Sequence, residues 1–332
     1  MLLTALRALY SRFSEPPQPR VSILGPRIDN FLEGAYAFVN ERTDQWSLDQ
    51  DVELDLTNRV MRVFVIDRTI GKHSKLVRGM CNIQHSDGGW GERRDEKESR
   101  MRSSAFCTQM LVRANRGHHS EFVTRSILRG LDYLVRSQKY EGSWVDHKAH
   151  QLEVTSVALG ALLHVVGQEG YGNSTHRIAL QRGIQHVEKV RATTRVWYRS
   201  VSASPVCITA HLVQKCVAYG LPLPYTMQTI ESLLDMQSPE GYWDRGDIGN
   251  TCDATRSMLL CATALRDDEL QRRVADSSSR ALRFLLDRVQ DGGLGERRTV
   301  APDVQRTASG IETVLRMEKY FEATPQLLRF WH

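Results

Sequence analysis

Tryptophan recurs along this chain at a nearly constant interval. Five of the six tryptophans are separated by 44, 54, 53 and 46 residues, and a leucine follows the last of these five after another 51. The positions are Trp46, Trp90, Trp144, Trp197, Trp243 and Leu294. A period near 50 residues is typical of proteins that stack copies of one supersecondary unit. We therefore expect a single repeat-built domain over residues 29–332, preceded by an N-terminal tail and a Pro-rich linker over residues 1–28.

A common motif surrounds these positions. The segments 84–90, 138–144 and 237–243 share the pattern Q-x-x-[DE]-G-x-W, and 290–294 is a shortened copy. An acidic residue followed by glycine favours a tight turn, because glycine adopts a positive φ at no steric cost. We expect the glutamine amide and the buried indole at the edges of each turn to tie one helix end to the next.

Two kinds of helical pattern alternate around the turns. Amphipathic runs precede them, at 122–137, 176–190 and 225–236. More uniformly apolar runs follow, at 104–112, 154–166, 205–217, 254–265 and 307–315. A helix that is apolar around most of its circumference is buried on both sides. Two helices in each of six repeats predict an all-α protein, a single (α/α)6 barrel or toroid with inner and outer helices and no sheet.

Composition narrows the class of protein. With 332 residues, 41% of them hydrophobic, the chain can bury a large core and needs neither disulfide nor metal to fold. Six cysteines without a CxxC pair predict free thiols and a cytoplasmic protein without a cofactor. No run reaches the roughly 18 apolar residues of a membrane span. A net charge of +5, without basic and aromatic residues interleaved, argues against nucleic-acid binding. Residues 1–13 predict a short amphipathic helix, either docked on the barrel or contacting a membrane surface or partner.

The sequence Q-x-x-D-G-G-W-G-E at 84–92 resembles the repeats of squalene–hopene and oxidosqualene cyclases. The resemblance covers roughly residues 30–320, and the β subunits of protein prenyltransferases share the same α/α toroid. It implies a central cavity, at the N-termini of the inner helices, that holds an isoprenoid. Class II cyclases place their active site between two barrels, whereas this chain has one. A second barrel or another protein partner is therefore an open alternative.

The zinc ligands of the prenyltransferases are not preserved. That family carries D-x-C and D-x-x-H-T, whereas this chain reads Asn250-Thr251-Cys252 and has Arg306 in place of the histidine. A guanidinium would repel the ion, so we expect no zinc site. The spacing of His147, His150 and Glu153 by three is a weaker metal candidate that matches no standard pattern. His211, four residues after Cys207, is either half of a thiol–imidazole pair or a buried histidine with its ring hydrogen-bonded.

Resemblance to class II cyclases points to an acid at the start of an inner helix. These enzymes protonate an alkene or epoxide with the aspartate of D-x-D-D-T-A or V-S-D-C-T-A. Here Asp253 stands two residues before Thr255 in the second spacing, and Glu153 precedes Thr155 in the same way. Asp303 keeps the first position of the other motif. The alternative for Asp253 is a helix N-terminal carboxylate that accepts backbone N–H groups, and the neighbouring Arg256 would favour its ionised form.

Arginines gather at the same predicted end of the barrel. Arg102 and Arg306 each lie eight residues after the near-identical segments 87–94 and 291–298, so the sequence predicts equivalent positions for them. With Arg256 they are candidates for binding an anionic head group such as a diphosphate; salt bridges to neighbouring carboxylates are the alternative. Further arginines expected at this end are Arg94, Arg199, Arg245 and Arg298. Phe106 and Tyr198 are the aromatic candidates for contact with a cationic intermediate, and their scarcity argues against a long polycyclisation.

These patterns favour an isoprenoid-handling enzyme similar to class II terpene cyclases, an isomerase or lyase. Asp253 is the expected acid and Glu153 the alternate. One alternative is a non-catalytic toroid that binds an acidic peptide or protein at its arginine-rich end. Another is a hydrolytic or lyase enzyme built on the cluster of His147, His150 and Glu153.

Overall fold

The computed structural model describes residues 22–43, 74–93, 95–116, 119–146, 151–191, 205–218, 226–295 and 303–330. Within these ranges most residues are helical. The α-helices are α2 (Pro26–Thr43), α4 (Ser74–Asn82), α5 (Met101–Asn115), α6 (Glu121–Arg136), α7 (Gln151–Leu162), α8 (Ser174–Arg191), α9 (Pro205–Ala218), α10 (Thr226–Asp235), α11 (Ile248–Leu265), α12 (Asp268–Leu286) and α13 (Val304–Ala323). A π-helical turn, η3 (Leu163–Gln168), continues α7, and η4 (Asp244–Gly246) and η5 (Pro325–Phe330) are 3-10 helices.

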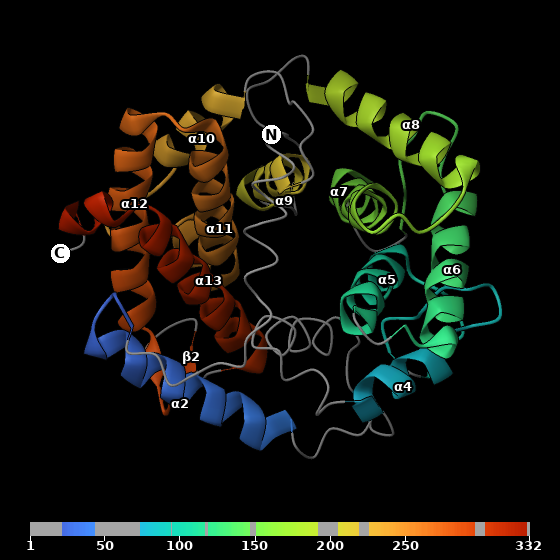
Figure 1. Cartoon of the computed structure of the whole chain (residues 1–332), viewed down its shortest axis with the longest axis horizontal. Helices are drawn as coiled ribbons and strands as arrows, with labels where there is room; N and C mark the ends of the chain where they lie inside the picture. Colours follow the sequence, from blue (N-terminus) through green and yellow to red (C-terminus); the bar gives the residue numbers. More distant parts are fainter. Residues whose placement is uncertain are drawn as a thin grey trace.

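The helices form two concentric rings (Figure 1). Helices α5, α7, α9, α11 and α13 form the inner ring, and α2, α4, α6, α8, α10 and α12 lie outside them. Helix α13 packs against α2, so the last inner helix meets the first outer one. The predicted all-α toroid is confirmed. The expected absence of sheet is wrong in one place: β1 (Val289–Gln290) and β2 (Gly293–Leu294) form a minimal antiparallel hairpin around the Asp291-Gly292 turn. None of the described helices is long and apolar enough to cross a membrane.

The glutamine of each of the three full motif copies connects two outer helices. The side-chain amide nitrogen of Gln84, Gln138 and Gln237 donates both to the carbonyl of its own turn glycine and to a carbonyl of the next outer helix. These acceptors are Gly88 and Ser126 at 2.8 and 2.9 Å, Gly142 and Ala179 at 3.0 and 2.8 Å, and Gly241 and Ser277 at 2.9 Å each. One amide therefore connects the turn that follows one outer helix to a carbonyl inside the next outer helix, whereas the sequence predicted a tie between two helix ends.

Each of the three described tryptophans joins the outer ring to the inner ring. The indoles of Trp90, Trp144 and Trp243 are fully buried, and each Nε1 donates to the carbonyl ten residues earlier, at 2.7–2.8 Å. Their backbone N–H groups donate to a hydroxyl on the following inner helix, as does that of Leu294. We call the four hydroxyl residues the register residues: Ser104, Thr155, Thr251 and Thr307, at 2.9, 3.0, 3.1 and 2.9 Å.

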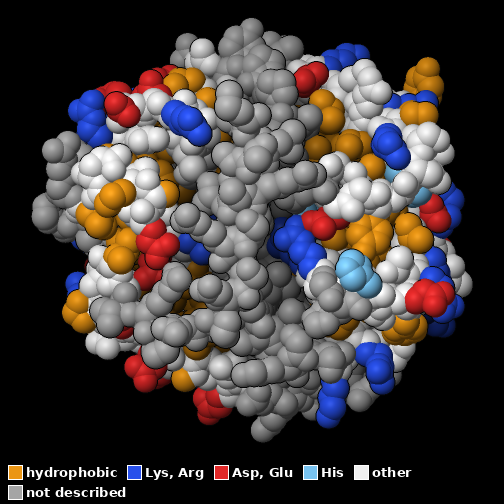
Figure 2. All heavy atoms as spheres, viewed as in Figure 1, with side chains coloured by type: hydrophobic (Ala, Val, Ile, Leu, Met, Phe, Trp, Pro, Cys, Tyr) orange, Lys and Arg blue, Asp and Glu red, His pale blue; other side chains and the backbone are white. Residues whose placement is uncertain are grey.

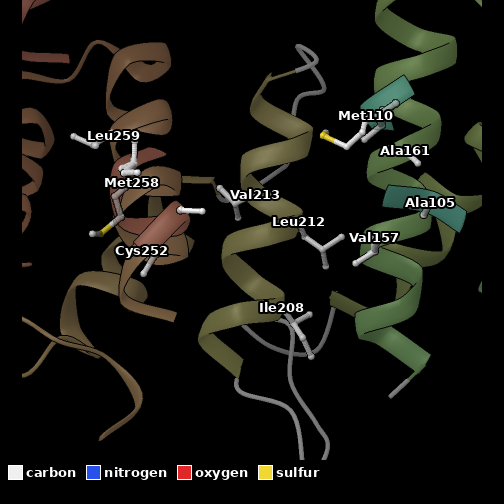
Figure 3. Packing of buried hydrophobic residues seen from close by; sticks show 14 of the residues in the cluster. Ala105, Met110, Val157, Ala161, Ile208, Leu212, Val213, Cys252, Met258 and Leu259 are labelled. Carbon is white, nitrogen blue, oxygen red and sulfur yellow. The ribbon is translucent and has the colours of Figure 1, made fainter. Parts of the chain in front are cut away.

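Apolar contacts fill the space between inner helices. Figure 3 shows Ile208 and Leu212 of α9 directed toward Val157 of α7, with α11 on the other side of α9. All three side chains are at most 5% exposed. Helix α7 is buried around most of its circumference, whereas α6 buries one face, which is the distinction that the sequence pattern predicted.

Candidate functional site

The register residues explain which polar side chains meet between inner helices. Arg102 and Glu153 each stand two residues before a register residue, and Arg256 and Glu312 each stand five residues after one. Equal offsets put the side chains at the same height on adjacent helices. Accordingly Arg102 Nη1 lies 2.9 Å from Glu153 Oε1, between α5 and α7, and Arg256 Nη1 lies 3.5 Å from Glu312 Oε2, between α11 and α13.

Asp253 lies inside helix α11 and not at its start. The helix begins at Ile248, and the side chain of Asp247 caps it by accepting a hydrogen bond from the Asn250 N–H at 2.7 Å. The interpretation of Asp253 as a helix N-terminal carboxylate is therefore wrong. Its side chain is 9% exposed, with Oδ2 3.2 Å from Nε2 of His211 on α9 and Oδ1 bound by the Arg256 guanidinium. The two carboxylate oxygens thus have different partners, one of them a titratable imidazole.

Arg256 is the centre of this group of side chains. It is 1% exposed, and its Nη1 donates to the Ser309 carbonyl at 2.9 Å and to Thr313 Oγ1 at 3.0 Å, both on α13. Burial lowers the pKa of Arg256, but the carboxylates of Glu312 and Asp253 raise it by more, so the guanidinium stays charged. An isolated buried cation would be strongly unfavourable, and these carboxylates offset that cost.

Further ionisable groups complete the cluster. Arg316, which is 29% exposed, lies 3.3 Å from Glu312 Oε1. We call Asp253, Arg256, Glu312, Arg316 and His211 together the α9–α11–α13 charge cluster. The neighbouring Cys252 thiol is fully buried, and this burial raises its pKa to about 11, so it is neutral at physiological pH.

A second, smaller group lies across α5 and α7. Arg102 is paired with Glu153, and its guanidinium carbon is 5.8 Å from the centroid of the Phe106 ring. Arg102 is 32% exposed and Glu153 is 20% exposed. Figure 2 shows basic and acidic side chains lying next to each other near the centre of this face. The alternate acid and one predicted head-group arginine are therefore bound to each other.

Asp303 and Arg306 form a third group at the start of α13. Asp303 is the N-cap: its Oδ1 accepts a hydrogen bond from the Arg306 N–H at 2.7 Å, and its Oδ2 pairs with the Arg306 guanidinium. The predicted equivalence of Arg102 and Arg306 is wrong by one residue, because the hydrogen bond of Leu294 to Thr307 makes Gln305 the counterpart of Arg102. One residue rotates a side chain by about 100° around a helix, which directs Arg306 toward its own cap.

Several candidates fall outside the described residues, namely Arg94, His147, His150, Tyr198, Arg199 and Arg298. The side chain of Cys207 is also undescribed, while His211 pairs with Asp253. Arg245 is exposed on η4, in a left-handed conformation with φ 60°. Among the described residues, no group of three or more His, Cys, Asp or Glu side chains is arranged to hold a metal ion.

Sequence reasoning missed Glu312 and the pairing of His211 with Asp253. Glu312 had a signal: it is the acid within the predicted apolar run 307–315, and its distance from Thr307 equals that of Arg256 from Thr251. A charged residue in an inner helix requires a buried partner of opposite charge. The contact of His211 had no such signal, because the repeat containing α9 lacks the glutamine and glycine of the motif and offers no recognisable register residue.

Comparison with known proteins agrees with this architecture. No family model matches the chain, and no curated protein matches it in sequence. Among solved structures, the type II terpene cyclase MstE from Scytonema matches with a TM-score of 0.66 and 13% identity, over 89% of this chain and 98% of that one. MstE has also been solved with geranylgeranyl dihydroxybenzoate as its substrate.

Two other structures show how widely the fold is used. The ent-copalyl diphosphate synthase from Streptomyces platensis matches with a TM-score of 0.57 and 17% identity, over 74% of this chain and 46% of that one. An α-amylase from Clostridium perfringens matches with a TM-score of 0.64 and 12% identity, over 88% of this chain and 99% of that one. At these identities the likeness establishes the fold alone. The chain is an α/α toroid of the kind found in type II terpene cyclases and in glycosidases.

Proposed function

We propose that this protein is an isoprenoid-handling enzyme of the protonation-initiated cyclase type, with Asp253 as the acid. The observation that carries the proposal is the contact of the buried Asp253 Oδ2 with His211, on an inner helix of a toroid shared with type II terpene cyclases. The acid would add its proton to an alkene carbon of the substrate and leave a carbocation. Arg256 and His211 would stabilise the resulting carboxylate, which makes Asp253 a stronger acid.

Arg102, Phe106 and Glu153 form the second part of the proposed site. Arg102 and Phe106 are half-buried on an inner helix, where a guanidinium can bind an anionic head group and an aromatic face can contact a cation. The head group must then compete with Glu153 for Arg102. Arg306 and Asp303 remain candidates for binding the head group. Their observed contacts are those of the N-cap of α13.

A turnover and thermal-shift screen tests this proposal. The substrates are prenyl diphosphates of increasing length and geranylgeranyl dihydroxybenzoate, with product analysis by mass spectrometry. We expect a cyclised product from the wild type and at least a 1,000-fold loss of turnover in Asp253→Asn, which keeps a hydrogen-bond acceptor for Arg256 but carries no acidic proton. The matched control is Asp247→Asn, four residues before Thr251, which still caps α11 and is expected to retain turnover.

The outcomes separate the alternatives. Equal turnover in wild type and Asp253→Asn would remove Asp253 as the acid and move the test to Glu153→Gln. No stabilisation and no product with any isoprenoid would overturn the proposal. The same screen includes an α-glucan and an aryl glycoside as substrates, because some toroids of this fold are glycosidases.

A non-catalytic toroid is the second candidate function. Arg102 and Arg306 are both about one-third exposed, which leaves them accessible to an acidic peptide that displaces Glu153 or Asp303. Loss of peptide binding in the double variant Arg102→Ala/Arg306→Ala, with Asp253→Asn unaffected, would favour this function.

A further inference from the structure

Glu312 is a buried carboxylate that the proposed chemistry does not use. Its side chain is 4% exposed, and it lies 3.5 Å from Arg256 and 3.3 Å from Arg316. Burying a carboxylate is costly, and the two neighbouring guanidiniums offset that cost for Glu312. Both of these contacts are with arginines, and one of those arginines also holds Asp253.

Arg256 transmits the charge of Glu312 to Asp253. While Glu312 is ionised, the positive charge beside Asp253 is offset by a negative charge on the far side of the guanidinium. If Glu312 were neutral, Arg256 would present a less compensated positive charge to Asp253 and His211. A positive potential disfavours proton binding by a carboxylate and by an imidazole alike. The sign of the effect therefore does not depend on which of the two holds the shared proton.

We propose that Glu312 is a positioning residue that sets, through Arg256, the pH at which the Asp253–His211 pair releases its proton. Ionised Glu312 keeps the pair protonated up to a higher pH than Arg256 alone would permit. In a cyclase this extends the pH range over which the acid is ready for turnover, and that consequence rests on the proposed function. The effect on proton binding does not.

The helices around the pair carry the following charges among the described residues, and the side chain of Lys215 on α9 lies outside them. Helix α9 contributes His211, α13 contributes Glu312 and Arg316, and α11 contributes Arg256 and the neutral Cys252 thiol. On the outer side, three arginines of α12 have carboxylate partners on α12 or α10: Arg272 with Glu269, Arg273 with Glu231 and Asp235, and Arg280 with Asp276. On α7, which packs against α9, Glu153 is paired with Arg102. Among the described residues, Arg256 and Glu312 are thus two buried charges of opposite sign that lie in series beside the pair.

The test is a histidine NMR titration of the full chain. The His211 ring signal is identified by its loss in His211→Asn, and its pH midpoint is compared between wild type and variants. We expect Glu312→Gln to lower the midpoint by about one pH unit, as one uncompensated charge a few ångströms away implies. Arg316→Gln removes a cation that competes for Glu312, so it should raise the midpoint by a smaller amount. Glu169→Gln, which removes the carboxylate of the remote Arg116 pair, is the matched control and should leave it unchanged.

An unchanged or raised midpoint in folded Glu312→Gln would overturn the proposal. If that variant does not fold, Arg316→Gln provides the test, because Arg316 is partly exposed and its substitution should be tolerated. A lowered or unchanged His211 midpoint in Arg316→Gln would count against the proposal. If Glu312 only stabilises the fold, Glu312→Gln would lower the melting temperature of the protein but leave the pH midpoint of His211 unchanged. The pH profile of turnover should shift in the same direction as the midpoint. A wild type without turnover would remove the proposed function and leave the NMR result standing.

Discussion

Three turn glycines stand where a side chain would collide with a neighbouring helix. At Gly241, with φ +95°, an added Cβ would lie 2.3 Å from the Arg280 carbonyl oxygen, and Gly88 and Gly142 meet Arg129 and Arg182 in the same way. Gly25 has nearly the same φ, +98°, but nothing within 4 Å of the added atom. The motif therefore requires glycine for two reasons, a left-handed backbone and the close approach of the next helix.

Alanine substitution of Gly25 and of Gly241 separates the cost of backbone strain from the cost of the steric collision. We expect Gly25→Ala to cost about 1 kcal/mol of unfolding free energy from backbone strain alone. Gly241→Ala should cost at least about 2 kcal/mol more, because the Arg280 backbone must move and the Gln237 hydrogen bonds with it. Denaturant unfolding of both variants measures the difference, and equal losses would show that the collision is relieved without cost.

Helices α11 and α13 both begin several residues earlier than the sequence pattern predicted. The predicted apolar run began at residue 254, whereas α11 begins at Ile248. The first turn, Ile248-Gly249-Asn250-Thr251, lacks an apolar pattern, but Asp247 caps it and Thr251 is fixed by Trp243. This difference moves Asp253 from the helix start to its buried second turn. Periodicity finds the middle of a helix, and capping contacts determine its ends.

The Asp303 N-cap should contribute measurably to the stability of α13. Asp303→Ala should lower the unfolding free energy by about 1 kcal/mol, since an N-cap acceptor is lost. Asp303→Asn keeps an acceptor for the Arg306 N–H and gives up a partly exposed ion pair, so we expect it to change stability by less than about 0.5 kcal/mol. Chemical unfolding tests this order. If Asp303 instead binds a head group, both variants would weaken the thermal shift produced by a prenyl diphosphate to a similar degree.

At the scale of the whole molecule, the toroid depends on the contact between its two ends. Helix α2 packs on α13 and on the β1–β2 hairpin, and Gly34 of α2 lies against Gly292 of the hairpin turn. Phe31 of α2, 4% exposed, reaches the backbone of α13 at Gly310. Residues nearly 280 positions apart in the sequence thus share one piece of core. A ring closed in this way should unfold as one cooperative unit.

Phe31→Ala tests the importance of this closure. We expect it to cost about 3–5 kcal/mol of unfolding free energy, the range for truncating a buried phenylalanine. Phe122→Ala on the outer face of α6, where the side chain is 45% exposed, is the matched control and should cost less than about 1 kcal/mol. Urea unfolding followed by fluorescence measures both. A second transition in Phe31→Ala, with part of the ring still folded, would contradict closure as a condition for cooperativity.

Local sequence patterns were sufficient to predict the repeat, the alternation of buried and amphipathic helices, and a linking role for the motif glutamines and tryptophans. These features follow from local periodicity and from the turn motif, in which Gln138, Gly142 and Trp144 each make a specific contact. Which candidate site residues contact each other depends instead on how the inner helices pack. Asp253 was a candidate from its motif, but its contact with His211 depends on how α9 packs against α11. The pairings of Arg102 with Glu153 and of Arg256 with Glu312 likewise depend on which inner helices pack side by side, because each register residue sets the height of its own helix but not the identity of its neighbour.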